Sequence, residues 1–204
     1  MDGPSHPRTG VFAGIYDPVI APFERLGLGG LRRETLRGLS GAVLELGVGT
    51  GRSLRSYPDS VSSVTGVDPD ETMLDRAARR LPEAGMPVRL LRAAGEDLPF
   101  PDGSFDAVTA FLTLCTVQSQ EAALREAWRV LAPGGELRLL EHVRVERKPL
   151  GRLQEALTPA WSRLAGGCHL DRRTLEGVSS VGFEVERIGR YLGGVVLRIH
   201  ARRA

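Results

Sequence analysis

Acids and alternating glycines between residues 45 and 68 have the types and spacing of a nucleotide-binding loop. Glu45 stands two residues before Gly47, and Gly49 and Gly51 follow at every second position. Glycines let a backbone turn sharply and let a ligand lie against it without meeting a Cβ atom. Asp68 follows a second apolar run, where an α/β fold places a carboxylate that accepts hydrogen bonds from ribose hydroxyls. We therefore expect a nucleoside-containing ligand here.

Two classes of cofactor compete for this loop. A dinucleotide fingerprint, G-x-G-x-x-G, would need its third glycine at position 52, which is Arg52. Glu45, at the end of a strand, suits a cationic ligand and has little use beside a pyrophosphate. This favours a sulfonium cofactor with an amino-acid ammonium group over NAD(P). A tight turn beside a surface acid is the other alternative, and the linked strand, loop and second acid argue against it.

These residues need a scaffold of alternating strands and helices, which the hydrophobic pattern predicts. Short apolar runs typical of buried parallel strands lie at 42–46, 61–67, 88–91, 105–111 and 137–143. The glycine loop should lead into a helix, and further helices are expected over 70–81 and 121–131. Runs at 183–191 and 195–200 are joined across Gly193-Gly194, which predicts a hairpin. The last strand should therefore be antiparallel to its partner.

The length and composition fit a single domain over residues 1–204. A chain of this length, with 42% hydrophobic and 25% charged residues, can bury a full core. We expect Gly27, Gly29 and Gly30 to split the N-terminal helical stretch, and Pro159 to kink or end a helix in 149–167. The expected parts are N-terminal lid helices at 1–40, a cofactor-binding core at 41–148, an acceptor-side insertion at 149–170, and a C-terminal helix and β-hairpin at 171–204.

The charge pattern argues against nucleic acid as a partner. The 27 basic residues are all Arg except Lys148, and they are interleaved with 25 acids, for a net charge of +2. Such a pattern is typical of a solvated, ion-paired surface. No apolar run reaches the ~20 residues of a membrane span, and the first ten residues lack the apolar run of a signal peptide. Cys115 and Cys168 make neither a disulfide framework nor a zinc motif, so we expect a cytoplasmic protein without a metal site.

Several motifs together carry a family resemblance. They are Glu45-Leu46-Gly47-Val48-Gly49-Thr50-Gly51, Val67-Asp68, Leu98-Pro99-Phe100, Phe105-Asp106-Ala107-Val108 and Arg129-Val130-Leu131-Ala132-Pro133-Gly134-Gly135. From about residue 12 to its end, the chain resembles a class I S-adenosylmethionine-dependent methyltransferase. The resemblance implies a Rossmann-like α/β fold, with a seven-stranded, mostly parallel sheet and an antiparallel C-terminal strand.

The resemblance also implies cofactor contacts at matching positions. Glu45 would orient the loop and the methionine ammonium group, and Asp68 would bind the ribose. Met73 would pack near the adenine or in the core of its helix. The position where many relatives carry an Asp for the adenine amine is Ala94 here, which leaves the Gly95 amide and the Glu96 carboxylate as substitutes. The full set of expected cofactor contacts is Tyr16, Glu45, Gly47, Gly49, Asp68, Pro69, Met73, Gly95, Glu96, Phe111 and Leu112.

On the acceptor side, three motifs narrow the resemblance to a small-molecule branch. Leu114-Cys115-Thr116-Val117, Leu140-Glu141-His142-Val143 and Gly167-Cys168-His169-Leu170 look like alkyl-thiol methyltransferases and, more distantly, quinone-biosynthesis and phospholipid N-methyltransferases. His142 should end the fifth strand, where open α/β sheets bind ligands. It could deprotonate an acceptor or hold a loop.

Further acceptor-side candidates have open alternatives. Glu141 could orient His142 or face solvent. Cys115 could line the acceptor pocket or pack, and His169 could close over the acceptor or lie on a lid surface. Trp161 could form an apolar acceptor wall or part of the core.

The leading hypothesis is transfer of a methyl group from S-adenosylmethionine to a small, partly apolar acceptor: a thiol, an amine or phospholipid, or a quinone-like ring. The reaction is an in-line displacement, which mainly requires positioning, and a base is needed only for a protonated nucleophile. The alternatives are an NAD(P)-dependent oxidoreductase and a non-catalytic S-adenosylmethionine-binding module. If the acceptor is a lipid, the apolar face of Val19, Ile20, Phe23 and Leu26 could touch a membrane, although packing over the pocket is the favoured alternative. Both a monomer and a homodimer stay open.

Overall fold

The computed structural model describes residues 17–18 and 21–204. Its seven-stranded sheet has the strand order β3-β2-β1-β4-β5-β7-β6. The strands are β1 Gly41–Leu46, β2 Val61–Asp68, β3 Val88–Arg92, β4 Phe105–Phe111, β5 Leu131–His142, β6 Phe183–Tyr191 and β7 Val196–Arg203. The first five strands pair in parallel, and β7 is antiparallel to both of its neighbours. The expected fold class is confirmed, including the reversed C-terminal strand.

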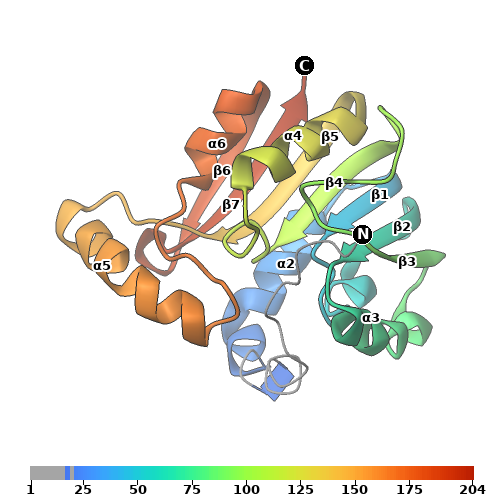
Figure 1. Cartoon of the computed structure of the whole chain (residues 1–204). Helices are drawn as coiled ribbons and strands as arrows, with labels where there is room; N and C mark the ends of the chain where they lie inside the picture. The colour runs from blue at the N-terminus through green and yellow to red at the C-terminus, as the bar shows by residue number, and fades with distance from the viewer. Residues whose placement is uncertain (1–16, 19–20) are drawn as a thin grey trace, which may run out of the picture.

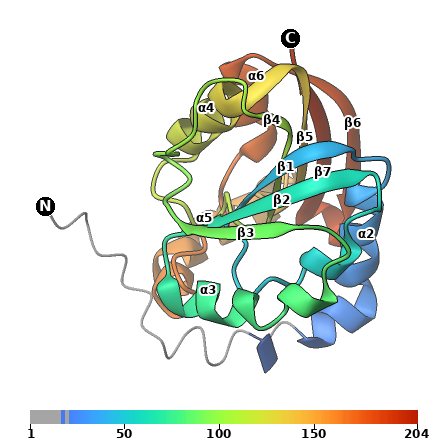
Figure 2. The same ribbon diagram turned by 90° about the vertical axis from the view of Figure 1, so that its right-hand side faces the viewer.

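Helices cover both faces of the sheet (Figures 1 and 2). The α-helices are α2 Gly29–Leu36, α3 Glu71–Ala78, α4 Gln120–Val130, α5 Lys148–Leu164 and α6 Thr174–Val181, with a π-helical turn η1 at Glu24–Leu28 and short 3-10 turns η2 Leu54–Ser56, η3 Leu81–Glu83 and η4 Leu192–Gly194. One buried cluster joins the sheet to α4 and α6, and a second joins its other face to α2 and η2. Helix α5 stands apart from these covering helices (Figure 1). No helix in the described part of the chain is long and apolar enough to cross a membrane.

The prediction of a helix after the glycine loop is wrong. The chain forms only the 3-10 turn η2, and Tyr57 is already extended, with φ −68° and ψ 138°. The reason is Pro58, because a residue that precedes proline disfavours the helical region. The link between β1 and β2 is therefore short, and Ser53 and Tyr57 turn inward, where both are buried.

Proline and glycine act differently from expectation in two other helices. Pro159 lies inside α5 without ending it. Because Pro159 and Glu155 are both exposed, solvent can satisfy the carbonyl that loses its N–H partner. Of the three N-terminal glycines named above, Gly27 interrupts the helix, with a φ of +138°, while Gly29 and Gly30 lie within α2.

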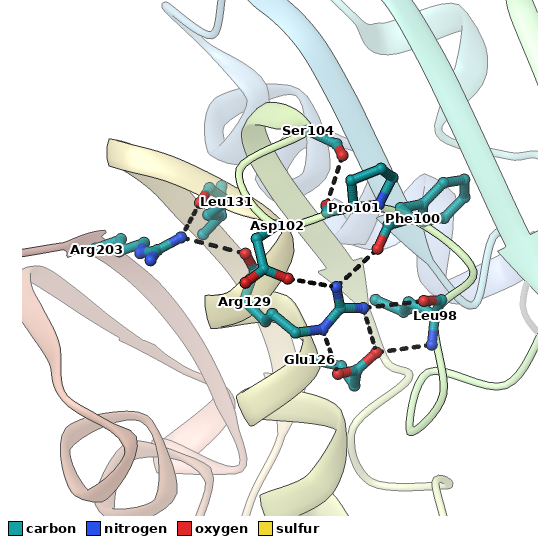
Figure 3. A network of polar contacts seen from close by, with 9 residues as sticks. All are labelled: Leu98, Phe100, Pro101, Asp102, Ser104, Glu126, Arg129, Leu131 and Arg203. Carbon is teal, nitrogen blue, oxygen red and sulfur yellow. Dashed lines mark hydrogen bonds and ion pairs between the residues drawn. The ribbon is translucent and has the colours of Figure 1, made fainter.

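One arginine links two of the sequence motifs (Figure 3). The Arg129 guanidinium on α4 donates hydrogen bonds to the carbonyls of Leu98 and Phe100, at 2.9 and 2.7 Å. It also pairs with Asp102 and with Glu126. Glu126 in turn accepts a hydrogen bond from the N–H of Leu98 at 2.8 Å. The planar guanidinium thus holds the connection between β3 and β4 against α4.

Candidate functional site at the carboxyl ends of the parallel strands

A cavity of about 990 Å³ opens at the edge where the parallel strands end. The strand order reverses between β1 and β4, and open α/β sheets bind ligands at such a switch point. The cavity brings together most of the predicted site residues: Gly47, Gly49, Asp68, Pro69, Met73, Gly95, Glu96, Phe111, Leu112, Cys115, His142 and Trp161. Glu45, Glu141 and His169 do not line it, and Tyr16 lies outside the described residues.

The glycine loop follows β1 with a tightly specified backbone. Gly47 has a φ of +61°, and a Cβ atom there would lie 2.3 Å from Cγ2 of Thr113. Gly49 has a φ of +55°, but a Cβ atom there would meet only the Gly47 carbonyl, at 3.8 Å. Gly47 is therefore needed for packing as well as for its left-handed backbone, whereas Gly49 leaves open space on the cavity side.

Asp68 ties the loop to the end of β2. Its Oδ2 atom accepts a hydrogen bond from the N–H of Gly49 at 3.0 Å, and its Oδ1 accepts one from the N–H of Asp70 at 2.9 Å. Asp70 then caps α3, accepting from the N–H of Thr72 at 2.8 Å. Met73, in the first turn of α3, is buried and borders the cavity.

Glu45 is buried beneath the loop, away from the cavity wall. Its carboxylate accepts hydrogen bonds from Ser53 Oγ at 2.5 and 2.7 Å and from the Tyr57 hydroxyl at 2.8 Å. Burial raises its pKa to about 7, although the bonds from Ser53 and Tyr57 act in the opposite direction. In this geometry Glu45 fixes the chain that follows the glycines.

The wall between β3 and β4 contains Gly95 and Glu96. Glu96 Oε1 accepts hydrogen bonds from the N–H groups of Gln118 and Ser119, at 2.7 and 3.3 Å. Ala94, at the position where many relatives carry an acid, pairs through its backbone with Asp97. The Glu96 carboxylate therefore holds the segment before α4 while it borders the cavity.

A strained turn ends β4. Leu112 has a φ of +57°, which is unusual for a residue with a branched side chain. The next two N–H groups, of Thr113 and Leu114, donate to Glu141 Oε1 at 3.0 and 3.1 Å. Glu141 is fully buried, so it neither faces solvent nor borders the cavity, and burial raises its pKa to about 7. This buried acid holds the strained turn in place.

His142 follows Glu141 on β5 and points into the cavity, because successive strand residues face opposite sides. Its Nδ1 atom is buried and has no hydrogen-bond partner among the described residues. Burial lowers the pKa of His142 below its ordinary value of 6.5. The imidazole is therefore neutral at pH 7, with a nitrogen able to accept a proton.

Comparison with known proteins identifies the family. A model described as a methyltransferase domain matches residues 44–139. Thiol S-methyltransferase TMT1A of Homo sapiens is 36% identical over 166 residues, covering 78% of this chain and 68% of that relative. The chain belongs to the S-adenosylmethionine-dependent methyltransferases.

Two further relatives of this methyltransferase have names that specify other acceptors. Phosphatidylethanolamine N-methyltransferase of Cereibacter sphaeroides is 40% identical over 119 residues, which are 57% of this chain and 58% of that relative. The ubiquinone/menaquinone biosynthesis C-methyltransferase UbiE of Vibrio parahaemolyticus is 32% identical over 177 residues, which cover 76% of this chain and 68% of that relative. A solved S-adenosylmethionine-dependent methyltransferase from Thermotoga maritima has a TM-score of 0.67 at 26% identity, and the match covers 95% of this chain and all of that one.

Family membership decides between the cofactors that competed for the loop. The methyltransferase uses S-adenosylmethionine, and the alternatives of an NAD(P)-dependent oxidoreductase and a non-catalytic module are set aside. The local geometry fits this cofactor. The open space beside Gly49 lets a ligand lie against the backbone. The Asp68 carboxylate, which borders the same cavity, suits ribose hydroxyls.

The methyltransferase cavity has further walls that the motifs did not indicate. Leu28 and Leu31 come from the N-terminal helices, and Tyr191, Leu192 and Val196 come from the C-terminal hairpin. Because the hairpin itself was predicted, the apolar residues at its tip were the signal in the sequence that could have indicated this wall. The packing of Leu28 and Leu31 over the carboxyl ends of the strands depends on the kink at Gly27, whose direction a sequence pattern does not specify.

Proposed function

We propose that the chain methylates a lipophilic thiol, with His142 as the base that accepts the thiol proton. The observation that carries this proposal is the position of His142 within one continuous cavity. Gly49 and Asp68 line this cavity, and so do apolar side chains such as Trp161 and Leu170. An acceptor with an apolar body would bury its chain there and present its polar end to the imidazole.

Gly47, Gly49, Asp68 and Met73 would hold the cofactor, which supplies an activated methyl group when bound. Asp68 would accept hydrogen bonds from the ribose hydroxyls while keeping its bond to the Gly49 N–H. Further cofactor contacts are proposed for Tyr16, Pro69, Gly95, Glu96, Phe111 and Leu112. Glu45 would act through Ser53 and the loop conformation.

The acceptor would be positioned by apolar walls and deprotonated at a defined atom. The neutral imidazole of His142 would take the thiol proton as the sulfur attacks, because burial disfavours its charged form and lowers its pKa. Exclusion of water would favour the thiolate as a nucleophile by removing its hydration shell. Cys115 and Trp161 would contact the acceptor body. Glu141 would position the β4 turn beside it, and His169, whose N–H donates to the Cys115 carbonyl at 2.8 Å, would help to close the acceptor end.

Thiols are favoured because the relative named a thiol S-methyltransferase matches 78% of this chain at 36% identity, and because the His142 imidazole can take the single proton that a thiol carries. The relatives named for thiol, phosphatidylethanolamine and quinone acceptors share this fold, so the acceptor atom must be set by the site. We also propose that the chain acts in the cytoplasm, where the thiols of Cys115 and Cys168 would stay reduced.

The test is transfer of a labelled methyl group from S-adenosylmethionine by the purified protein. Decanethiol, decylamine and a reduced quinone would be compared at equal concentration, with Asp68→Asn as the control for cofactor binding. We expect decanethiol to be methylated at least about tenfold faster than the other two. Faster methylation of the amine or the quinone would contradict the thiol assignment.

A further inference from the structure

Helix α5 carries an apolar stripe that the described part of the protein leaves uncovered. Leu150, Leu153, Leu157, Trp161 and Leu164 recur three or four residues apart, so they share one face of the helix. Their exposed fractions run from 45% for Leu150 to 80% for Leu164. Soluble proteins seldom expose so many large apolar side chains together, and such patches mark interaction surfaces. We call these five residues the α5 stripe.

The α5 stripe continues into the mouth of the cavity. Trp161 and Leu164 line the cavity, together with three other exposed apolar residues, Phe23, Leu26 and Leu192. These three come from the N-terminal helices and from the tip of the C-terminal hairpin, far apart in sequence. The cavity therefore opens through an apolar rim whose outer side is the α5 stripe.

The segment that contains the stripe is strongly basic. Residues 144–173 hold seven basic and three acidic side chains, whereas the whole chain has a net charge of only +2. Two of these acids are paired, Glu155 with Arg144 and Glu146 with Arg190. On α5 itself Lys148, Arg152 and Arg163 are exposed, and no described acid forms an ion pair with them. By helical spacing these basic residues lie on the side of α5 opposite the stripe, so the helix has one apolar side and one basic side. The partner that fits such a helix is apolar inside and negatively charged at its surface.

We infer that the α5 stripe and the cavity rim dock on an anionic phospholipid bilayer. An interfacial helix presents leucine and tryptophan to the acyl boundary and arginine and lysine to the headgroups, which is the composition of α5. Each basic residue near an anionic surface adds to the attraction. Phe23 and Leu26, which belong to the N-terminal apolar face considered for a membrane contact, lie on this rim. Residues 19 and 20 of that face lie outside the described part.

Docking in this orientation would turn the cavity mouth toward the lipid. A lipophilic acceptor could then pass from the bilayer past Trp161 and Leu164 without crossing water. This last step rests on the proposed function, but binding to lipid does not. Vesicle binding measured without cofactor or acceptor therefore tests the surface independently of methyl transfer.

The two tryptophans of the chain provide the readout. Trp128 packs beneath Arg203, with the guanidinium carbon 3.8 Å from the ring centroid, and Trp161 lies on the α5 stripe. In a Trp128→Phe background, Trp161 is the sole tryptophan. We expect its emission to shift to the blue and to be quenched by brominated acyl chains when vesicles of phosphatidylcholine and phosphatidylglycerol are added. Vesicles of phosphatidylcholine alone should bind at least about tenfold more weakly, because the basic side chains lose their partner.

A matched pair of variants separates the stripe from general surface effects. Leu157→Glu changes a stripe residue that does not line the cavity, and Ile188→Glu changes an exposed apolar residue on β6. Leu157→Glu should weaken sedimentation with the anionic vesicles about tenfold or more, and Ile188→Glu should leave it unchanged. If Leu157→Glu folds poorly, Arg152→Glu with Arg163→Glu tests the same surface by its charge.

Three outcomes would overturn the inference. Equal binding by the Leu157 and Ile188 variants would remove α5 from the lipid contact. A concentration-dependent dimer that Leu157→Glu dissociates, with no vesicle binding by the parent, would assign the stripe to a second copy. Vesicle binding that appears only after deletion of residues 1–16 would show that the N-terminal segment covers the stripe.

Discussion

Arg52 donates a hydrogen bond from Nε to Oδ1 of Asp17, at 2.7 Å, and a second from Nη2 to the Asp17 carbonyl, at 3.0 Å. Position 52 is where a dinucleotide fingerprint would require its third glycine. Here that position holds an arginine that ties the start of the described chain to the glycine loop. Thr50 Oγ1 and Arg80 also donate to Asp17, at 2.9 and 2.8 Å. Asp17 is thus anchored on the cofactor loop itself.

Removing this anchor should weaken both the fold and the cofactor site. Asp17→Ala leaves Arg52 and Arg80 without their acid, so we expect a loss of about 1–3 kcal/mol in the free energy of unfolding. The affinity for S-adenosylhomocysteine should fall about tenfold, as measured by calorimetric titration. Asp75→Ala, an exposed acid on α3, is the control. Equal affinity in the two variants would show that the anchor does not shape the cofactor site.

Acid should weaken the same anchor. Burial raises the pKa of Asp17, but hydrogen bonds from Arg80, Arg52 and Thr50 outweigh it and hold the pKa below its ordinary value of 3.8. The stabilisation is therefore present above that value and is lost as the pH falls through the lower pKa of the folded state.

The two glycines of the loop should respond differently to alanine. Gly47→Ala places a Cβ atom against Thr113 and strains the backbone, so unfolding should become easier by about 3 kcal/mol. Gly49→Ala meets open space and should cost only about 1 kcal/mol. Its Cβ atom would instead occupy the ligand's side of the loop and sharply reduce S-adenosylhomocysteine binding. Denaturant unfolding measures the loss of stability, and calorimetric titration with S-adenosylhomocysteine measures the loss of binding. A Gly49→Ala variant that is stable and binds with the wild-type affinity would contradict the predicted role of Gly49.

Arg129 should be irreplaceable by lysine. Lysine keeps the charge but lacks the fork that reaches the carbonyls of Leu98 and Phe100 together with Asp102 and Glu126. Arg129→Lys should therefore lower the free energy of unfolding by about 2 kcal/mol. Arg125→Lys, on the exposed face of the same helix, should cost less than about 0.5 kcal/mol. Similar losses in both variants would mean that the network in Figure 3 adds little stability.

The buried Glu141 predicts a stability that falls as the pH rises. Its pKa is raised by burial from 4.5 to about 7, so between these values the folded state holds a proton that the unfolded state has released. Glu45, whose pKa is raised in the same way, causes a similar loss in both proteins, so the wild type should lose up to about 3 kcal/mol more than Glu141→Gln across that window. Chemical denaturation at several pH values, with exposed Glu184→Gln as the control, measures the difference. A constant difference between Glu141→Gln and the wild type would exclude a buried proton on Glu141.

Strong periodicity made most of the fold predictable. The strand at 105–111 and the hairpin strand at 183–191 have the expected bounds, because their apolar runs are bordered by turn residues. The missing helix after Gly51 and the unbroken α5 were not predicted. Each depends on the local environment of a proline. Pro58 forces the preceding residue into the extended region, whereas Pro159 is tolerated because the helix is exposed to solvent there.

The candidate site was predictable wherever a residue ends a parallel strand. Asp68, Phe111 and His142 reach the cavity for that reason. Side-chain direction at neighbouring positions was not predictable, so Glu141 was expected beside His142 or in solvent, whereas it lies buried beneath the β4 turn. Walls such as Tyr191 and Leu28 come from segments that have no motif, and only tertiary packing brings them together.

The most direct test of the proposed chemistry is the pH dependence of kcat/KM for decanethiol in the wild type and in His142→Gln. If His142 accepts the thiol proton, wild-type kcat/KM should fall as the pH drops through a pKa below 6.5. In His142→Gln, kcat/KM at pH 7 should be lower than in the wild type by a factor of about 100. It should recover toward high pH, where the thiol ionises without a base. A His142→Gln enzyme with the wild-type rate and pH profile would contradict the proposal and leave His142 as part of the cavity wall.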